Sequence, residues 1–245
     1  MRYLLIDIGN SEVKAALGFS NRTNVKLLKR FSHSKSNFEK EFIKNLKQFR
    51  HLNFDSAGVS VQDFKKRTLI KKLCKKIFNI SPVFVERKMV KNIKIDYSES
   101  LGIDRICNVV AAVAAYGSKN LLVIDFGTAT TFTIASNKEL KGGLICPGLI
   151  TALKALSANA KLPKVKINKP DKLYFNDTVN NITAGGFYQT LFSVKGIMNE
   201  FRKQFKNLKI ITTGGLSNYF TTELPRSVLN DMQLTLKGIK LIIER

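Results

Sequence analysis

Residues 3–17 read YLLIDIGNSEVKAAL, and residues 121–135 read LLVIDFGTATTFTIA. Each stretch begins with an apolar run typical of a buried strand, reaches an aspartate and a glycine, and continues apolar beyond a turn rich in hydroxyl or amide side chains. The two aspartates, Asp7 and Asp125, stand 118 residues apart. A pattern that occurs twice at this distance predicts a duplicated unit of strands and helices.

The segments around the two stretches support this duplication. After the first strand, two short strands joined by the turn SNRTN predict an antiparallel meander. An alanine-rich apolar segment at 101–117, with glycine near both ends, predicts a tightly packed helix. Further strands are predicted at 13–19, 25–31, 56–60, 81–86 and 209–213, and further helices at 35–49, 69–78, 149–157 and 178–205. We therefore expect an α/β fold of two domains, 1–117 and 118–245, with a central cleft between the copies.

The composition narrows the classes of function. An apolar fraction of 44% and a charged fraction of 24% are typical of a soluble globular protein. No apolar run approaches the roughly 20 residues that cross a bilayer, and Asp7 closes the first run before a signal-peptide core can form. We expect a cytoplasmic protein without a membrane segment. Three separated cysteines and two histidines argue against a disulfide framework, a zinc site or a nucleophilic triad.

The net charge of +23 arises from 41 Lys and Arg against 18 Asp and Glu. Such a charge occurs in nucleic-acid binders. Here the basic residues are mostly lysines spread along the whole chain, and no aromatic residues alternate with them to stack bases. We therefore do not expect a nucleic-acid partner, although the same positive field favours an anionic small substrate.

The chemistry of the turns points to phosphate. Gly9 permits a positive φ and a close backbone approach, and the N–H groups and hydroxyls that follow it are suited to phosphate oxygens. A carboxylate beside phosphate needs a cation between them, which suggests Mg²⁺. The alternative at each copy is a plain turn with Asp and Asn chosen for turn geometry. A third glycine turn, Gly214-Gly215, follows a predicted strand, whereas the GxxxxGK[ST] and GxGxxG motifs are absent.

Several motifs carry a resemblance to one family when they are taken in order. They are DIGNS (7–11), LGIDR (101–105), DFGTATTF (125–132), GGLICPG (142–148), Leu162-Pro163, NDTVNNITAGGFY (176–188), TTGG (212–215) and LTLKGI (234–239). In this order and spacing the chain resembles type III pantothenate kinase over nearly its whole length. The resemblance implies two duplicated ribonuclease H-like domains of the actin-like ATPase and sugar kinase superfamily.

The resemblance also implies an activity, the ATP-dependent phosphorylation of pantothenate to 4'-phosphopantothenate, which is the first step of coenzyme A biosynthesis. Asp104 matches the base that accepts the proton of the pantothenate hydroxyl, and Arg105 suits the substrate carboxylate. Thr178 matches a threonine that reaches the substrate from the other subunit of a homodimer. The implied pantothenate-binding residues are Tyr97, Gly102, Ile103, Asp104, Arg105 and Thr178.

Each of these residues also has a purely structural interpretation. Asp104 also reads as a helix N-cap or first-turn acid, Arg105 as a surface ion pair, and Thr178 as an N-cap. The whole chain also admits two other functions, a non-catalytic transcriptional accessory factor of the same family and a kinase for another small hydroxy acid.

The family match assigns ATP and its cations to the glycine turns. Asp125 matches the position that holds a monovalent cation, K⁺ or NH₄⁺, and Asp7 matches the acid near Mg²⁺, directly or through water. The implied ATP-binding residues are Asp7, Ile8, Gly9, Asn10, Ser11, Glu12, Val13, Lys14, Thr128, Gly214 and Gly215.

Two positions depart from the family pattern. Thr133 stands where the family commonly has Asp, after the GTATTF motif. The family's substrate-contacting tyrosine usually lies seven residues before the motif glycine, where this chain has Ile95. Tyr97, five residues before Gly102, is the nearest candidate if the intervening loop is two residues shorter.

Overall fold

The computed structural model describes residues 1–117 and 119–244, and their contacts divide the chain into two compact units. The first unit comprises Met1–Gly117, Lys138–Leu140 and Gln233–Arg245, and the second comprises Ser118–Asn137 and Lys141–Met232. The predicted boundary lies beside residue 118, which is outside the described residues. The contacts group the last helix with the first unit, whereas the division from sequence placed it in the second domain.

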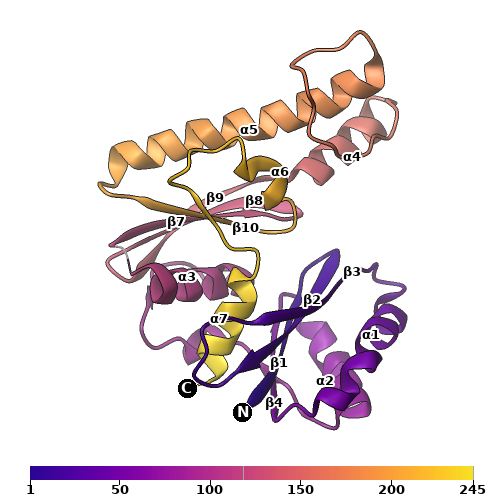
Figure 1. The fold of residues 1–245 in the computed structure, drawn as a ribbon, viewed down its shortest axis with the longest axis vertical. Coiled ribbons are helices and arrows are strands. Elements are labelled where there is room, and N and C mark those ends of the chain that lie inside the picture. Colours follow the sequence, from indigo (N-terminus) through magenta and orange to yellow (C-terminus); the bar gives the residue numbers. More distant parts are fainter. Residues whose placement is uncertain (118, 245) are drawn as a thin grey trace. The chain divides into compact units, whose positions relative to one another are not determined.

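The first unit is built on a sheet of strand order β3-β2-β1-β4-β5 (Figure 1). β1 pairs antiparallel with β2 and parallel with β4, and β2 pairs antiparallel with β3, so the predicted meander is confirmed. Its elements are β1 (Arg2–Ile8), β2 (Glu12–Phe19), β3 (Lys26–Ser32), α1 (Phe38–Leu46), β4 (Ser56–Val61), α2 (Arg67–Phe78), β5 (Val83–Phe84), β6 (Lys94–Ile95), α3 (Ile103–Tyr116) and α7 (Leu234–Ile243), with 3-10 helices at Lys47–Leu52, Phe64–Lys66 and Arg87–Met89.

The second unit repeats this topology. Its strands follow the order β9-β8-β7-β10-β11, with β7 antiparallel to β8 and parallel to β10, and β10 parallel to β11. Its elements are β7 (Asn120–Phe126), β8 (Ala129–Ser136), β9 (Glu139–Pro147), α4 (Leu149–Asn159), α5 (Thr178–Gln204), β10 (Lys209–Thr213), α6 (Ser217–Thr221) and β11 (Leu229–Asn230). The first two residues of β9 pair with β6 and belong to the first unit. The predicted duplicated α/β fold is confirmed.

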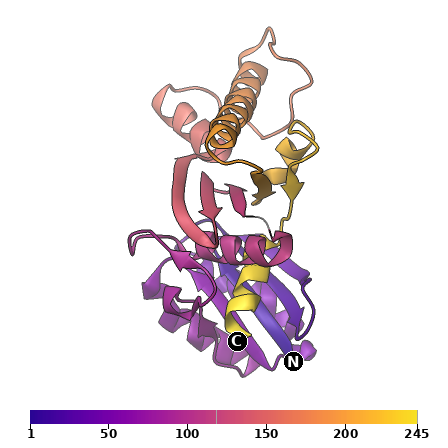
Figure 2. The same cartoon turned by 90° about the vertical axis from the view of Figure 1, so that its left-hand side faces the viewer.

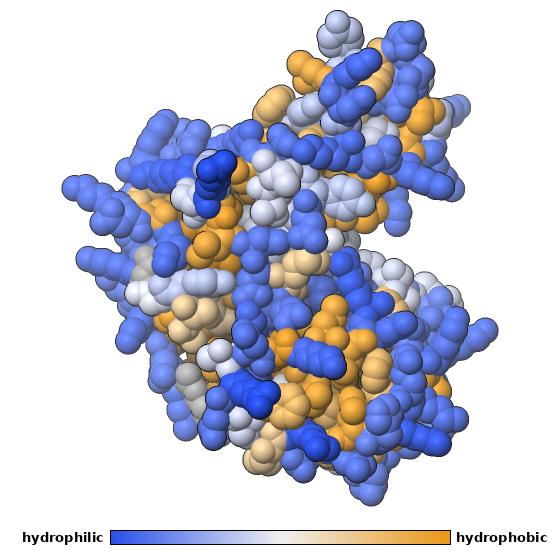
Figure 3. Space-filling model, viewed as in Figure 1, coloured by the Kyte–Doolittle hydropathy of each residue, from blue (hydrophilic) through white to orange (hydrophobic). Residues whose placement is uncertain are grey.

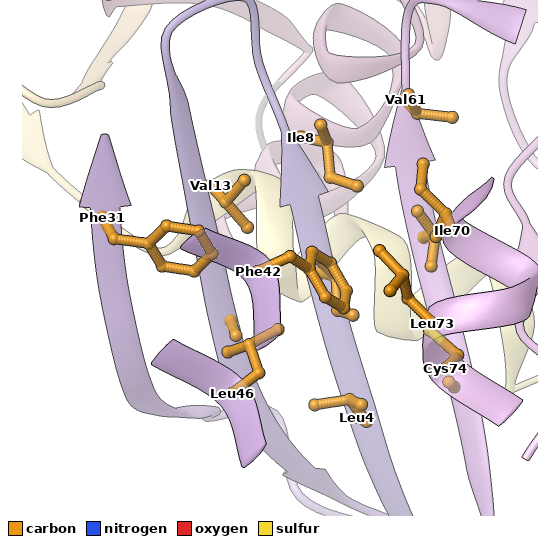
Figure 4. Close-up of a cluster of buried hydrophobic side chains, with 14 of the residues drawn as sticks. Leu4, Ile8, Val13, Phe31, Phe42, Leu46, Val61, Ile70, Leu73 and Cys74 are labelled. Carbon is orange, nitrogen blue, oxygen red and sulfur yellow. The ribbon is translucent and has the colours of Figure 1, made fainter. Parts of the chain in front are cut away.

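The apolar run of β1 is continuous because helices cover both faces of this strand. Leu4, Ile6 and Ile8 point to one face and pack in a buried cluster with residues of α1 and α2 (Figure 4). Leu5 points to the opposite face, where its side chain and that of Lys240 in α7 both approach Gly18. A strand that is buried on both faces loses the alternation of apolar and polar residues, which explains the sequence of residues 3–6.

The second unit has its own core on one face of its sheet. Alternate residues of β7, Leu122, Ile124 and Phe126, pack with side chains of α4 and α5, and these two helices lie on one side of the sheet (Figures 1 and 2). The ring of Phe220 stacks on Phe126 at 4.8 Å and on Phe187 at 5.0 Å between centroids. The chain of three rings ties β7, α5 and α6 together, and it holds the end of β7 in place.

Helix α3 is the longest helix of the first unit, and α7 packs along it. Thr235 Oγ1 of α7 donates to Asn108 Oδ1 of α3 over 2.8 Å, and both side chains are buried. Helix α7 also contacts β1, β2 and β4. It therefore joins α3 to the sheet and fixes the position of the N-terminus of α3. Across the described part of the chain, no helix combines the length and apolar character needed to span a bilayer.

Candidate active site

The first glycine turn lies between β1 and β2. Gly9 N donates to Glu12 O over 2.9 Å, which closes the turn directly after the strand. His33, at the end of β3, braces the turn, because its backbone N donates to Ser11 O at 3.0 Å and its Nε2 lies 3.1 Å from Gly9 O. Gly9 does not use the left-handed conformation that glycine permits, since its φ lies outside that region. The sequence did not single out His33 as part of this turn.

The residues around this turn that are predicted to contact ATP differ in their exposure to solvent. Asn10 and Ser11 are exposed at its tip, and Asp7 is half-buried. The side chains of Ile8 and Val13 are buried in the core of the first unit, so these two residues offer a ligand only their backbone groups. Asp7 pairs with Lys14 across β1 and β2, which places an ammonium-bearing residue beside the carboxylate.

The second glycine turn, between β7 and β8, is one residue shorter than the first. Gly127 N donates to Ala129 O over 3.1 Å, two positions on, whereas Gly9 N donates to Glu12 O, three positions on. The start of α4 supports this turn, because Gly148 N (3.2 Å) and Thr151 Oγ1 (2.6 Å) both donate to Thr128 O. A Cβ at Gly148 would lie 2.4 Å from Gly127 O, so this position of the GGLICPG motif requires glycine.

The third glycine turn meets the second one. Thr213 pairs with Asp125 across the parallel strands β10 and β7, and the chain then turns at Gly214 with a φ of +93°. A Cβ on Gly214 would lie 2.3 Å from Asp125 Oδ1. The structure therefore brings Asp125 and Gly214 together, and it leaves no room for a side chain between them.

A buried hydroxyl accompanies this pair. Thr213 Oγ1 is buried and has no hydrogen-bond partner among the described residues. Residues paired across two strands project to the same face of a sheet, so this oxygen and the Asp125 carboxylate lie on one face of the second unit. A buried polar atom without a protein partner is uncommon and points to a bound ion, water or ligand.

Asp104 lies in the first turn of α3, where Gly102 is the N-cap residue. Its Oδ1 accepts hydrogen bonds from Gln62 Nε2 at 2.6 Å and from Arg105 N at 2.8 Å. Burial raises the pKa of the Cys107 thiol well above its ordinary value, and the charges of Asp7 and Asp104 raise it further. The two predicted acids of the first unit therefore both lie near enough to Cys107 for their charges to act on its thiol.

The predicted pantothenate residues of the first unit also lie together. The Arg105 side chain is 5% exposed, so the alternative of a surface ion pair is wrong. Its guanidinium carbon lies 5.5 Å from the centroid of the Tyr97 ring. The structure thus places Tyr97, Gly102, Asp104 and Arg105 in one neighbourhood, although Tyr97 is displaced by two positions from the family pattern.

Thr178 belongs to the second unit and is exposed as the first residue of α5. The cap of this helix is Asp177, whose Oδ1 accepts from Asn180 N at 2.9 Å. That backbone hydrogen bond is the largest of the effects that lower the pKa of Asp177. The N-cap alternative for Thr178 is therefore wrong, and Thr178 instead lines a groove of about 860 Å³ between α4 and α5.

The described residues contain no cluster of side chains that could by itself form a metal site. No group of three or more His, Cys, Asp or Glu side chains among them is arranged to hold a metal ion. Thr133, which stands where the family commonly has Asp, is buried in β8. Any cation bound at Asp7 or Asp125 would therefore need ligands beyond a set of protein carboxylates.

The comparisons with known proteins agree with this geometry. A family model described as type III pantothenate kinase matches residues 3–200. A curated type III pantothenate kinase of Halalkalibacterium halodurans is 32% identical, with 99% of this chain and 98% of the relative covered. The corresponding protein of Geobacillus kaustophilus is 34% identical, with 98% of this chain and 96% of the relative covered.

Solved structures confirm the fold. A conserved putative Baf family transcriptional activator from Campylobacter jejuni matches with a TM-score of 0.59 at 24% identity, covering 98% of this chain and 97% of the other. A ROK family glucokinase from Streptomyces griseus, solved with glucose and AMPPNP, matches with a TM-score of 0.55 at 11% identity and 98% coverage of both chains. The match to the family model and the two curated relatives show that the chain belongs to the type III pantothenate kinase family.

Proposed function

We propose that this protein transfers the γ-phosphoryl group of ATP to the terminal hydroxyl of pantothenate, the first step of coenzyme A biosynthesis. The observation that carries the proposal is the carboxylate of Asp104, which is held at the start of α3 by two N–H donors next to the buried Arg105. Phosphoryl transfer asks a protein mainly to align the reacting oxygens and to stabilise charge. A fixed carboxylate beside a guanidinium meets that demand for a substrate that carries a hydroxyl and a carboxylate.

In this proposal the residues of the first unit act on pantothenate. Asp104 accepts the proton of the hydroxyl as that oxygen attacks phosphorus. Arg105 binds the pantothenate carboxylate through its planar donors, and the Tyr97 ring holds the guanidinium by a cation–π contact at 5.5 Å. Gly102 and Ile103 form the adjoining wall, and Thr178 of a second subunit completes the site.

The glycine turns are assigned to ATP. The exposed tips of the first and second turns, at Asn10, Ser11 and Thr128, offer hydroxyl, amide and backbone N–H groups to phosphate oxygens. Gly214 and Gly215 serve the nucleoside end. The remaining contacts proposed for ATP are Asp7, Ile8, Gly9, Glu12, Val13 and Lys14.

Asp7 fits Mg²⁺ bound together with ATP. Magnesium prefers oxygen ligands, retains several waters, and is commonly held by one or two carboxylates plus substrate phosphates. A single half-buried carboxylate at a strand end, without a larger ligand cluster in the described residues, matches that donor set. The ion supplies charge neutralisation at the phosphates, and Asp7 fixes where that charge stands, either directly or through water.

Asp125 fits a monovalent cation, K⁺ or NH₄⁺. The observation that supports this assignment is the buried Thr213 Oγ1, which has no described hydrogen-bond partner and belongs to the residue paired with Asp125. A carboxylate and a hydroxyl oxygen on one sheet face are suitable ligands for such a cation. The close approach of Gly214 keeps Asp125 in place.

We also propose a homodimer formed through α4 and α5. Large apolar side chains are exposed on these helices, including Leu156 at 42%, Val179 at 47% and Phe192 at 55% exposure. The groove that Thr178 lines is walled by alanine, leucine and glycine residues of both helices, and hydrophobic atoms are visible over them (Figure 3). Exposed apolar surface of this kind marks interaction sites, and a second copy would bring its own Thr178 to this face.

We propose that the enzyme acts in the cytoplasm, in keeping with its proposed use of ATP.

The test is a kinase assay on the purified protein with ATP, Mg²⁺, K⁺ and pantothenate. We expect ADP to form, a product heavier than pantothenate by one phosphoryl group, and a lower rate when Na⁺ replaces K⁺. Turnover with other small hydroxy acids but not with pantothenate would favour the second kinase alternative. Folded protein that makes no ADP with any of them would overturn the proposal and favour the accessory factor.

A further inference from the structure

Gln62 contacts the proposed base although the two residues are 42 positions apart in the sequence. It directly follows β4, whose last residue, Val61, pairs with Ile8 of β1. Gln62 and Gly9 therefore leave the same edge of the sheet from neighbouring parallel strands. From this edge the Gln62 amide reaches α3 and donates from Nε2 to Asp104 Oδ1 over 2.6 Å.

The residue beside this hydrogen bond is shaped to accommodate it. Gly102 has φ −61° and ψ 135°, a conformation open to any residue, so its backbone does not require glycine. A Cβ at this position would lie 2.4 Å from Asp104 Oδ1 and 2.8 Å from Gln62 Nε2. The missing side chain therefore leaves the space in which the amide and the carboxylate meet.

We propose that Gln62 is a positioning residue for Asp104. The inference rests on the proposed function. Asp104 Oδ1 accepts hydrogen bonds from Gln62 Nε2 and from Arg105 N. These two donors fix the plane of the carboxylate and hold it in the orientation in which it takes the substrate proton.

The step balances with the groups already named. The O–H bond of the pantothenate hydroxyl breaks, and its proton moves to the Asp104 carboxylate. The hydroxyl oxygen forms the new bond to the γ-phosphorus. The bond between that phosphorus and the β–γ bridging oxygen breaks, and ADP leaves with its electron pair. Gln62 is a neutral donor, so it orients the carboxylate without placing a positive charge beside it.

Gln62→Met tests the inference, because methionine has a similar length and lacks the N–H donor. We expect kcat to fall by about 10- to 100-fold, the scale of a misplaced catalytic group, while KM for pantothenate and for ATP changes by less than about twofold. Gln62→Glu places a second carboxylate against Asp104 and should lower kcat further. The control is Gln48→Met, which changes an exposed glutamine whose side-chain amide donates to Asn45 O and should leave kcat unchanged.

A double-mutant cycle separates positioning from a general loss of structure. If Gln62 acts through Asp104, Gln62→Met should not lower the residual rate of Asp104→Asn further. Additive losses, or a wild-type kcat in Gln62→Met, would overturn the inference while the proposed function stands. Wild-type protein that is folded and inactive on pantothenate would overturn the proposed function and this inference with it.

Discussion

Gly238 of α7 lies directly against the backbone of Cys107 in α3, since a Cβ on Gly238 would stand only 2.0 Å from Cys107 O. The two helices are thus in backbone contact at this point. Three residues before Cys107 along α3 is Asp104, so the crossing of α7 sets the height of the proposed base above the sheet. The LTLKGI motif contributes to the proposed site in this way, by positioning α3.

Gly238→Ala should therefore destabilise the protein. The added methyl group meets backbone that cannot turn away, and overpacking of this kind costs about 1–3 kcal/mol. Denaturant unfolding followed by circular dichroism measures the change. Gly196→Ala in α5 is the matched control, because nothing lies within 4 Å of the added carbon and alanine favours a helix over glycine by about 1 kcal/mol. Equal stability of the two variants would contradict the backbone contact.

Much of the fold was predictable because the first strand of each unit, β1 or β7, is apolar on both faces and the long helix α5 is strongly periodic. The repeat of β1–β2 at β7–β8 is visible in the letters of the sequence, and the two sheets share one strand order. Helix α7, which includes Gly238, was not predicted; most of its ten residues are buried, so its sequence shows no clear polar face. That glycine is explained only by the contact with Cys107, which is tertiary. The helix expected at 35–49 is instead the shorter α1 (Phe38–Leu46), followed by a 3-10 helix at Lys47–Leu52.

The site shows the same limit. Asp7 and Asp125 were proposed from the sequence because each follows an apolar run, and Asp104 was proposed through its motif. Gln62 also follows a strand directly, so the signal that flagged the aspartates was present there. A single amide reads as an ordinary turn residue until its partner is known, and that partner lies 42 residues away. His33 escaped notice for a similar reason, because its role is to brace a turn 24 residues earlier.

Gly214→Ala should disturb the second unit at Asp125. Its φ of +93° strains any L side chain, and the new Cβ would lie 2.3 Å from Asp125 Oδ1. We expect KM for ATP to rise by about tenfold, as for a displaced binding group. The control is Gly117→Ala, which has a φ of +54° with nothing within 4 Å, so it shares the strain without the clash. A normal KM for ATP in Gly214→Ala would argue against the placement of Gly214 in the nucleotide site.

The three cysteines should differ sharply toward a thiol reagent. Burial raises the pKa of Cys74 from 9.0 to about 12 and raises that of Cys107 as well, whereas Cys146 is partly exposed. At pH 8 we expect one fast-reacting thiol in folded protein and three after denaturation, because the thiolate is the reactive form. Mass spectrometry should locate the label on Cys146, and Cys146→Ser should remove the fast phase. Rapid labelling of Cys107 would contradict the packing of α3.

The raised thiol pKa also gives stability a direction with pH. The unfolded Cys74 thiol titrates near 9.0 and the folded one near 12, so its contribution is fully present below pH 9 and is lost as pH rises toward 12. Denaturant unfolding at several values from pH 8 to pH 10.5 should show a falling free energy of unfolding. Repeating the series with Cys74→Ala should give a shallower fall, since lysines titrate in both proteins. Parallel curves would show that Cys74 is not protected in the folded state.

Asp104→Asn should abolish most turnover and leave the fold intact. Asparagine keeps an oxygen at the position that accepts from Gln62 Nε2 and Arg105 N, but it has no basic oxygen to take the hydroxyl proton. The loss expected for a general base is about 10²- to 10⁴-fold in kcat. Steady-state ADP formation measures it, and thermal unfolding checks the fold. Asp171→Asn, an exposed acid in the loop before α5, should keep normal kcat. Near-normal turnover in Asp104→Asn would show that Asp104 is not the base, because the carboxylate is the only group that this variant lacks.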